Sequence, residues 1–270
     1  MESWIRIGIV VLAIGVVGVL GTWQASALVS SRGALGPTML QSISPLSSIV
    51  AVLITVGVAS LIGGFVARLT SATTGMFILG FSLFAMALKL EGVEELILSN
   101  GNWNLLVLEA AFLSAIVLLG AITVFAIGGP LQCVQKAKPD EKLTAQVGTA
   151  ILLSLAILPV IWLIAYTPAK GQVIGTVALG AIGIGFLARQ FLGTMQPILL
   201  FALPIAFGGV GYFIGMTLGG TDATAFAQQK MSWLLYPMPL DYAAGIIIGL
   251  SIGFGWTAPT VENSTPEIAL

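Results

Sequence analysis

Two carboxylates that lie within apolar stretches are the residues of this sequence best suited to chemistry. Glu109 follows the apolar residues 105–108, and Asp241 follows Pro237 and Pro239 just before another apolar run. Burying an ionised carboxylate in hydrocarbon costs about 2.5 to 3.5 kcal/mol, so such residues usually face a cavity or a partner and mark ion or proton paths. The alternative is a structural place at the outer interface, near helix N-termini whose dipoles favour negative charge.

Two arginines follow almost the same short sequence in different parts of the chain. Residues 64–68 read GFVAR and residues 185–189 read GFLAR, and each stretch ends one apolar run just before the next. One hypothesis places Arg68 and Arg189 at the inner mouth of a central cavity, where they hold anionic headgroups or a substrate carboxylate. The alternative is that both anchor helix ends at the cytoplasmic surface.

A polar residue beside a proline is the remaining candidate for a binding role. Gln196 precedes Pro197 and lies near Thr194, within an apolar stretch that also contains Pro204. Carbonyls freed by proline, together with Gln196, are possible ion ligands, as in the broken helices of transporters. The alternative is that Pro159, Pro197 and Pro204 simply kink or interrupt their helices.

The composition places these residues in a membrane protein. Hydrophobic residues make up 57% of the chain and charged residues 8%, and mean hydropathy is +1.06, so lipid must cover much of the surface. A net charge of −1 gives no basic field for nucleic acid. One cysteine and no histidine argue against disulfides, clustered zinc ligands and histidine bases, and we expect no metal, no cofactor and no enzymatic activity.

Charge-free runs of about 20 residues identify the membrane spans that position these side chains. The sequence predicts an all-α, polytopic protein with eight of them: Ile7–Val29, Pro45–Ala67, Ser71–Leu88, Leu105–Gly129, Ala145–Tyr166, Val173–Ala188, Met195–Leu218 and Tyr242–Pro259. The first run has an alternative interpretation as a signal peptide, because residues 25–27 (ASA) resemble a cleavage site. Its apolar length favours a retained helix.

Repeated features indicate that the eight spans form two parallel four-helix halves. Besides the two arginine sequences, residues 108–111 (LEAA) resemble residues 240–244 (LDYAA), and Trp23 and Trp162 lie near the outer ends of the first and fifth spans. We therefore predict a first repeat (1–134), a basic cytoplasmic linker (135–144), a second repeat (145–259) and a disordered tail (260–270). Four spans per half orient both halves alike, and a pathway commonly lies between such repeats.

The basic residues predict that both termini lie in the cytoplasm, with the protein in the plasma membrane. The segments assigned to the inside carry six lysines and arginines and those assigned to the outside carry four. The inside set is Arg6, Arg68, Lys136, Lys138, Lys142 and Arg189, and the outside set is Arg32, Lys89, Lys170 and Lys230. An outside cluster of Glu91, Glu94 and Glu95 is expected to pair with Lys89 or to remain solvated.

Glycines recur every four residues in the last two spans. Gly211, Gly215 and Gly219 form one row, and positions 245, 249 and 253 form the other. Small residues at this spacing let helix backbones approach closely in lipid. The rows either join the last two helices or face other chains, so the expected partners are membrane lipids and, in the second case, further copies or other membrane subunits.

Two functions remain open. The leading hypothesis is a small transporter or channel whose pathway runs between the halves, with Glu109 and Asp241 as cation or proton sites and the two arginines at its inner mouth. The alternative is a non-catalytic scaffold or accessory subunit of a larger membrane complex. A transporter requires a polar cavity that reaches Glu109 or Asp241, whereas a scaffold is packed throughout.

Overall fold

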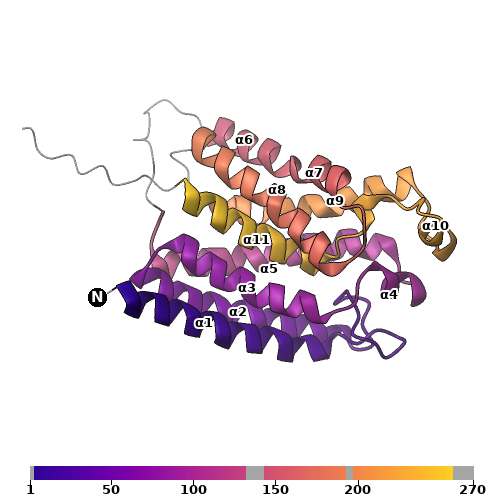
Figure 1. Ribbon diagram of the computed structural model, residues 1–270, viewed down its shortest axis with the longest axis horizontal. Helices are drawn as coiled ribbons and strands as arrows, with labels where there is room; N and C mark the ends of the chain where they lie inside the picture. The colour runs from indigo at the N-terminus through magenta and orange to yellow at the C-terminus, as the bar shows by residue number, and fades with distance from the viewer. Residues whose placement is uncertain (1–2, 132–142, 193–196, 258–270) are drawn as a thin grey trace, which may run out of the picture.

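The computed structural model describes residues 3–131, 143–192 and 197–257, and it is built from helices. Eight helical segments in these ranges are long and apolar enough to cross a membrane, as the sequence predicts. They run alongside one another as a bundle (Figure 1). The helices are α1 (Ser3–Gln24), α2 (Pro45–Leu69), α3 (Ala72–Lys89), α4 (Val93–Leu98), α5 (Trp103–Gly128), α6 (Leu143–Leu155), α7 (Ile157–Ile164), α8 (Lys170–Phe191), α9 (Leu203–Leu218), α10 (Ala223–Ala227) and α11 (Pro239–Trp256).

Proline explains the two places where a predicted span is interrupted. The fifth span is broken at Ala156 into α6 and α7. The ring of Pro159 cannot coexist with a regular helix there, because it would clash with the carbonyl of Leu155, the last residue of α6. The seventh span starts as a 3-10 helix (Pro197–Phe201) and becomes α-helical only at Leu203, with Pro204 in its first turn. The prediction of interrupted helices is confirmed.

The last helix, α11, is the central one of the bundle. It packs against α8 on one side and α3 on the other, and Figure 1 shows it lying between these two helices. Its span is also the most enclosed of the eight, with 78% of its residues buried. The most extensive contacts between the predicted halves are those of α3 with α11 and of α5 with α9.

The glycines of α11 explain its close packing on α8. A Cβ at Gly245 would lie 2.7 Å from the Val177 side chain, and one at Gly253 would lie 2.5 Å from the Ile182 carbonyl oxygen. The row of glycines therefore faces a helix of the same chain. Gly211, in the other row, faces Leu158 of α7. The two rows thus do not face each other, and both are used within the chain.

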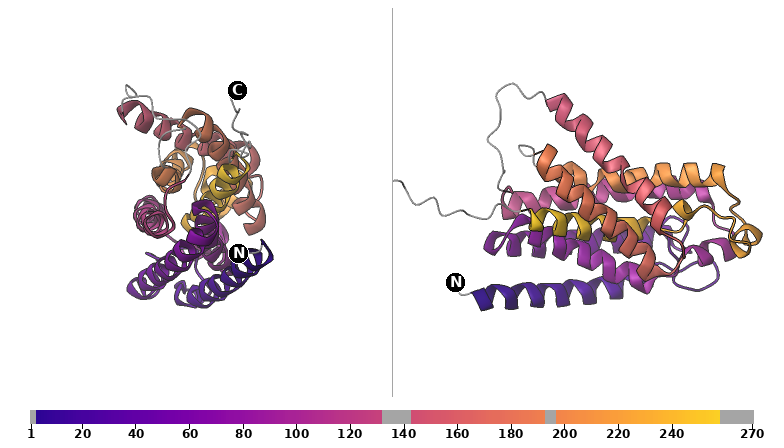
Figure 2. Two further views of the ribbon diagram at one scale, coloured as in Figure 1. Left: turned by 90° about the vertical axis from the view of Figure 1, so that its left-hand side faces the viewer. Right: turned by 45° about the horizontal axis from the view of Figure 1, so that its top comes forward.

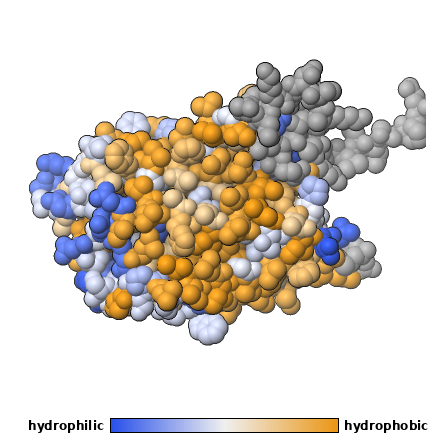
Figure 3. Space-filling model, turned by 180° about the vertical axis from the view of Figure 1, so that it is seen from behind, coloured by the Kyte–Doolittle hydropathy of each residue, from blue (hydrophilic) through white to orange (hydrophobic). Residues whose placement is uncertain are grey.

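The first and fifth spans lie on opposite sides of the bundle. Figure 2 shows α1 along one flank and the broken pair α6–α7 inclined along the other. These two spans are the least enclosed, with 17% and 28% of their residues buried. The exposed side chains on them are large and apolar, such as Leu12, Val19 and Leu152. Figure 3 shows the hydrophobic surface of one face, with most of its hydrophilic residues at one end and a few at the other.

The two ends of the bundle differ in charge. We call one the basic end, because it holds Arg6, Arg68 and Arg189 and, among the described residues, no carboxylate. The other is the acidic end, where α4, α10 and the loop 28–44 lie (Figure 1). It carries all the described carboxylates, Glu91, Glu94, Glu95, Glu109, Asp222 and Asp241, together with Arg32, Lys89, Lys170 and Lys230. An even number of spans places both ends of the described chain at the basic end.

Candidate functional site

Glu109 is fully buried and holds the loop between the first two spans. Its Oε1 accepts a hydrogen bond from the backbone N–H of Met39 at 2.8 Å, and its Oε2 accepts one from Leu40 at 3.1 Å. The residue lies in the second turn of α5, near the acidic end. Both carboxylate oxygens are therefore engaged by the loop 28–44, and this loop is closed over the end of the bundle.

Asp241 is also buried, but it has a charged partner. Lys170 Nζ lies 2.8 Å from its Oδ1 and 3.1 Å from its Oδ2, and its Oδ2 accepts a hydrogen bond from the Met238 N–H at 2.9 Å. The aspartate is in the first turn of α11, as the preceding prolines indicate, and the lysine is the first residue of α8. This ion pair joins the starts of the two most closely packed helices.

Two buried tyrosines lie near the carboxylates. The rings of Tyr212 and Tyr242 meet edge to face with centroids 5.8 Å apart. The Tyr212 hydroxyl donates to the Pro237 carbonyl at 2.7 Å, whereas the Tyr242 hydroxyl has no hydrogen-bond partner within the described chain. Tyr212 is within electrostatic range of both Glu109 and Asp241. The sequence alone did not single out these two tyrosines, because aromatic residues are common in apolar spans.

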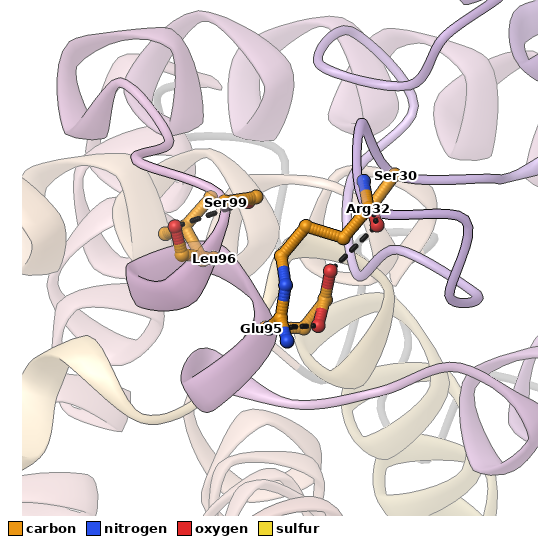
Figure 4. A network of polar contacts seen from close by, with 5 residues as sticks. All are labelled: Ser30, Arg32, Glu95, Leu96 and Ser99. Atoms are coloured by element: carbon orange, nitrogen blue, oxygen red, sulfur yellow. Dashed lines mark hydrogen bonds and ion pairs between the residues drawn. The ribbon is translucent and has the colours of Figure 1, made fainter.

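The cluster of carboxylates at residues 91–95 is organised by Arg32 rather than by Lys89. Glu95 is buried and pairs with Arg32 at 3.1 Å, and the Ser30 hydroxyl donates to its other oxygen at 2.6 Å (Figure 4). Among the described residues Lys89 makes no ion pair, so of the two alternatives for this cluster the pairing with Lys89 is not observed, and Glu95 is buried rather than solvated. Burial, and then the nearby carboxylate of Glu94, raises the pKa of Tyr236 above its usual value.

Arg68 and Arg189 line one cavity at the basic end. It has a volume of about 550 Å³ and lies between the ends of α2 and α8, the start of α3 and the end of α11. We call it the basic pocket. Arg68 Nε donates to the Ile127 carbonyl at 2.7 Å, which fixes the side chain against the end of α5. The pocket is lined by residues of both predicted halves, as the sequence hypothesis for the arginines requires.

Hydroxyl groups face the same pocket at the start of α3. Ser71 caps this helix by accepting a hydrogen bond from the Thr74 N–H at 3.3 Å. Its hydroxyl also lies 2.7 Å from that of Thr73 and 3.0 Å from that of Thr74. With Thr70, these residues line the basic pocket. Two guanidinium groups, four hydroxyls and the positive end of a helix dipole make this cavity suited to an anion.

The structure therefore brings the candidate residues together in pairs at opposite ends. The arginines share the basic pocket, and the two carboxylates lie at the acidic end, near Tyr212. Gln196 lies outside the described residues, as do Cys133, most of the predicted linker and the predicted tail. The carbonyl of Ala202, at the break before α9, accepts hydrogen bonds from the Ile205 and Ala206 N–H groups and from the Ser114 hydroxyl at 2.9 Å. These contacts favour a simple break over an ion site.

Comparison of the chain with family models, with curated proteins and with solved structures gives no match. The class of protein that the fold defines is an integral, multi-pass helical membrane protein. Its function must be argued from the two sites themselves.

Proposed function

We propose that this protein is a non-catalytic accessory subunit of a larger membrane assembly. The proposal rests on one observation: both buried carboxylates already have partners within the chain. Glu109 accepts hydrogen bonds from two backbone amides, and Asp241 pairs with Lys170 and accepts a hydrogen bond from a third amide. A carboxylate that relays protons or cations needs contact with a water-filled path. Neither residue lines the basic pocket or the other cavities that we describe.

Close packing between the predicted halves supports the same function. A Cβ at Gly80 of α3 would lie 3.0 Å from side-chain atoms of Ile247 and Ile248 in α11. A Cβ at Gly209 of α9 would lie 3.2 Å from the carbonyl oxygen of Val107 in α5. Helices in such contact leave no room for a pathway at these levels of the bundle. The protein then acts through its surface and its assembly.

A second candidate function is transport of an anion, and the basic pocket favours it. The pocket is polar, lies between the predicted halves and opens at one end of the bundle. Two guanidinium groups attract anions electrostatically. In this case the arginines would be the substrate site, and the carboxylates would be structural rather than part of a cation path.

The first experiment is purification from the native membrane in a mild detergent. The mass of the intact assembly and the identity of each co-purifying chain are then determined. An accessory subunit is expected to bring foreign chains in stoichiometric amounts. A homogeneous monomer or self-assembly would contradict this function.

A flux assay in liposomes tests the cation path directly. Wild-type protein and the variants Glu109→Gln and Asp241→Asn are compared for proton and cation flux, with Asp222→Asn as the matched control. Asp222 is an exposed cap of the short helix α10. The accessory-subunit proposal predicts no flux in any sample. Flux that the control retains and the two other variants lose would establish the transporter instead.

A further inference from the structure

An apolar groove runs along the outside of the bundle between α3 and α8, with α11 as its floor. Figure 1 shows α11 between the two helices, and the cavity between them measures about 420 Å³. Phe77, Phe81 and Phe84 of α3 form one wall. The opposite wall contains Gly171 and Gly175 of α8, where a side chain would meet nothing within 4 Å. The groove is open on this side because two of the four α8 residues that line it are glycines.

A smaller cavity of about 230 Å³ adjoins both the groove and the basic pocket. It shares Phe77 and Ile252 with the groove, and it shares Thr73, Thr74 and Gly255 with the basic pocket. One path therefore leads from two guanidinium groups at the end of the bundle to an apolar surface at membrane depth.

The path runs along most of the length of the bundle. At the rise of an α-helix, the distance along α3 from Thr74 to Leu88 is about 21 Å, which is more than half of a hydrocarbon core about 30 Å thick. Gly171, beside Lys170, places the far end of the groove near the acidic end of the bundle. The groove is also open sideways, where lipid surrounds the bundle.

We propose that the basic pocket and the groove together bind one anionic glycerophospholipid. Its phosphate lies between Arg68 and Arg189 at the start of α3, and an acyl chain follows the groove past Phe77 and Phe81. Charge complementarity argues for this occupant over a helix of a partner protein. The pocket at the head of the groove combines two cationic side chains, hydroxyl donors and a helix N-terminus, which together suit the phosphate of an anionic lipid.

This site is independent of the proposed accessory role, because it uses neither Glu109 nor Asp241. It explains why α8 lacks side chains at Gly171 and Gly175 although glycine weakens a helix by about 1 kcal/mol relative to alanine. It also accounts for the hydroxyls of Thr73 and Thr74 at the mouth of an otherwise apolar groove. The bound lipid would be part of the folded bundle at its basic end.

The test is native mass spectrometry of the full chain in mild detergent, with dioleoyl phosphatidylglycerol and dioleoyl phosphatidylcholine as probes. Wild-type protein is expected to retain one phosphatidylglycerol molecule in preference to phosphatidylcholine. Replacing Arg68 and Arg189 together by glutamine should lower that preference about 25-fold, because each cation near an anionic lipid contributes roughly a factor of five. Arg6→Gln, at the same end but outside the pocket, should leave it unchanged.

Glycine variants test the groove separately from the charges. Gly255→Leu fills the junction and Gly175→Leu fills the groove, and both positions have open space for a side chain. Each should abolish retention of the lipid, whereas Gly183→Leu, at another exposed and open position of α8, should not. Thermal unfolding without lipid verifies that each variant is folded. Because Arg68 also holds the Ile127 carbonyl, Arg68→Lys is included to keep the charge.

Three results would overturn the proposal. The first is equal retention of phosphatidylglycerol by wild type, Gly255→Leu and Gly175→Leu. The second is equal retention of the two lipids by wild type. The third is binding of inorganic phosphate by wild type with no retention of phosphatidylglycerol, which would identify the pocket as a site for a free anion. If the double arginine variant fails to fold, the glycine variants decide the question.

Discussion

Burying Asp241 beside Lys170 exchanges the hydration of two charges for one close ion pair and one backbone hydrogen bond. The aspartate is 1% exposed and the lysine side chain 17%, so the pair is largely removed from water. Such a pair adds little stability over apolar residues of similar size, but the loss of one partner leaves an uncompensated buried charge. Glu109 lacks this vulnerability, since its partners are backbone amides.

Removing the lysine alone should therefore be costly. We expect Lys170→Met to lower the free energy of unfolding by about 3 to 5 kcal/mol, because Asp241 then remains buried without its counter-ion. The double variant Lys170→Met/Asp241→Asn should recover a large part of that loss. The measurement is unfolding in detergent followed by circular dichroism. Lys230→Met, at an exposed position of the same end, is the control. Equal destabilisation by Lys170→Met and Lys230→Met would contradict this role of the Lys170–Asp241 ion pair.

At the scale of helices, the contact between α8 and α11 depends on glycine. A Cβ at Gly249 would overlap the Ala178 carbonyl oxygen and lie 2.7 Å from the Ala181 Cβ. We expect Gly249→Ala to destabilise the bundle by about 1 to 3 kcal/mol, because the two backbones must separate to admit one methyl group. Gly183→Ala, where that methyl group has open space, should be neutral or stabilising. Equal melting temperatures for the two variants would show that this contact is not tight.

The helices themselves were predictable, whereas their contacts were not. Runs such as Pro45–Ala67 identify spans because the length and hydropathy of a helix are local properties, and the break near Pro159 follows from local sterics. The partner of Asp241 lies at the start of another helix, and its identity depends on how α8 packs on α11. The groove was equally hidden, since the sequence alone does not tell whether Gly175 faces a helix or lipid. The predicted duplication stays a prediction.

For the whole molecule, the distribution of charge between the two ends sets its expected orientation. The basic end has three described arginines and no described carboxylate, and the acidic end has four basic and six acidic residues. The segment that connects α5 with α6 carries Lys136, Lys138 and Lys142. The end of α5 and the start of α6, which this segment joins, both lie at the basic end. Six lysines and arginines against four favour the basic end as the cytoplasmic one, because positive residues are retained on that side.

Single-cysteine labelling tests this orientation. In a Cys133→Ser background, which removes the one native thiol, a cysteine replaces either Gln229 at the acidic end or Arg6 at the basic end, and both positions are exposed. We expect a membrane-impermeant maleimide to label Gln229→Cys in intact cells and to label Arg6→Cys only after permeabilisation. The reverse pattern would place the basic end, with its proposed lipid site, in the other leaflet. Labelling of both positions in intact cells would contradict the seven spans, an odd number, that lie between Arg6 and Gln229, and with it the assignment of the eight helices as membrane spans.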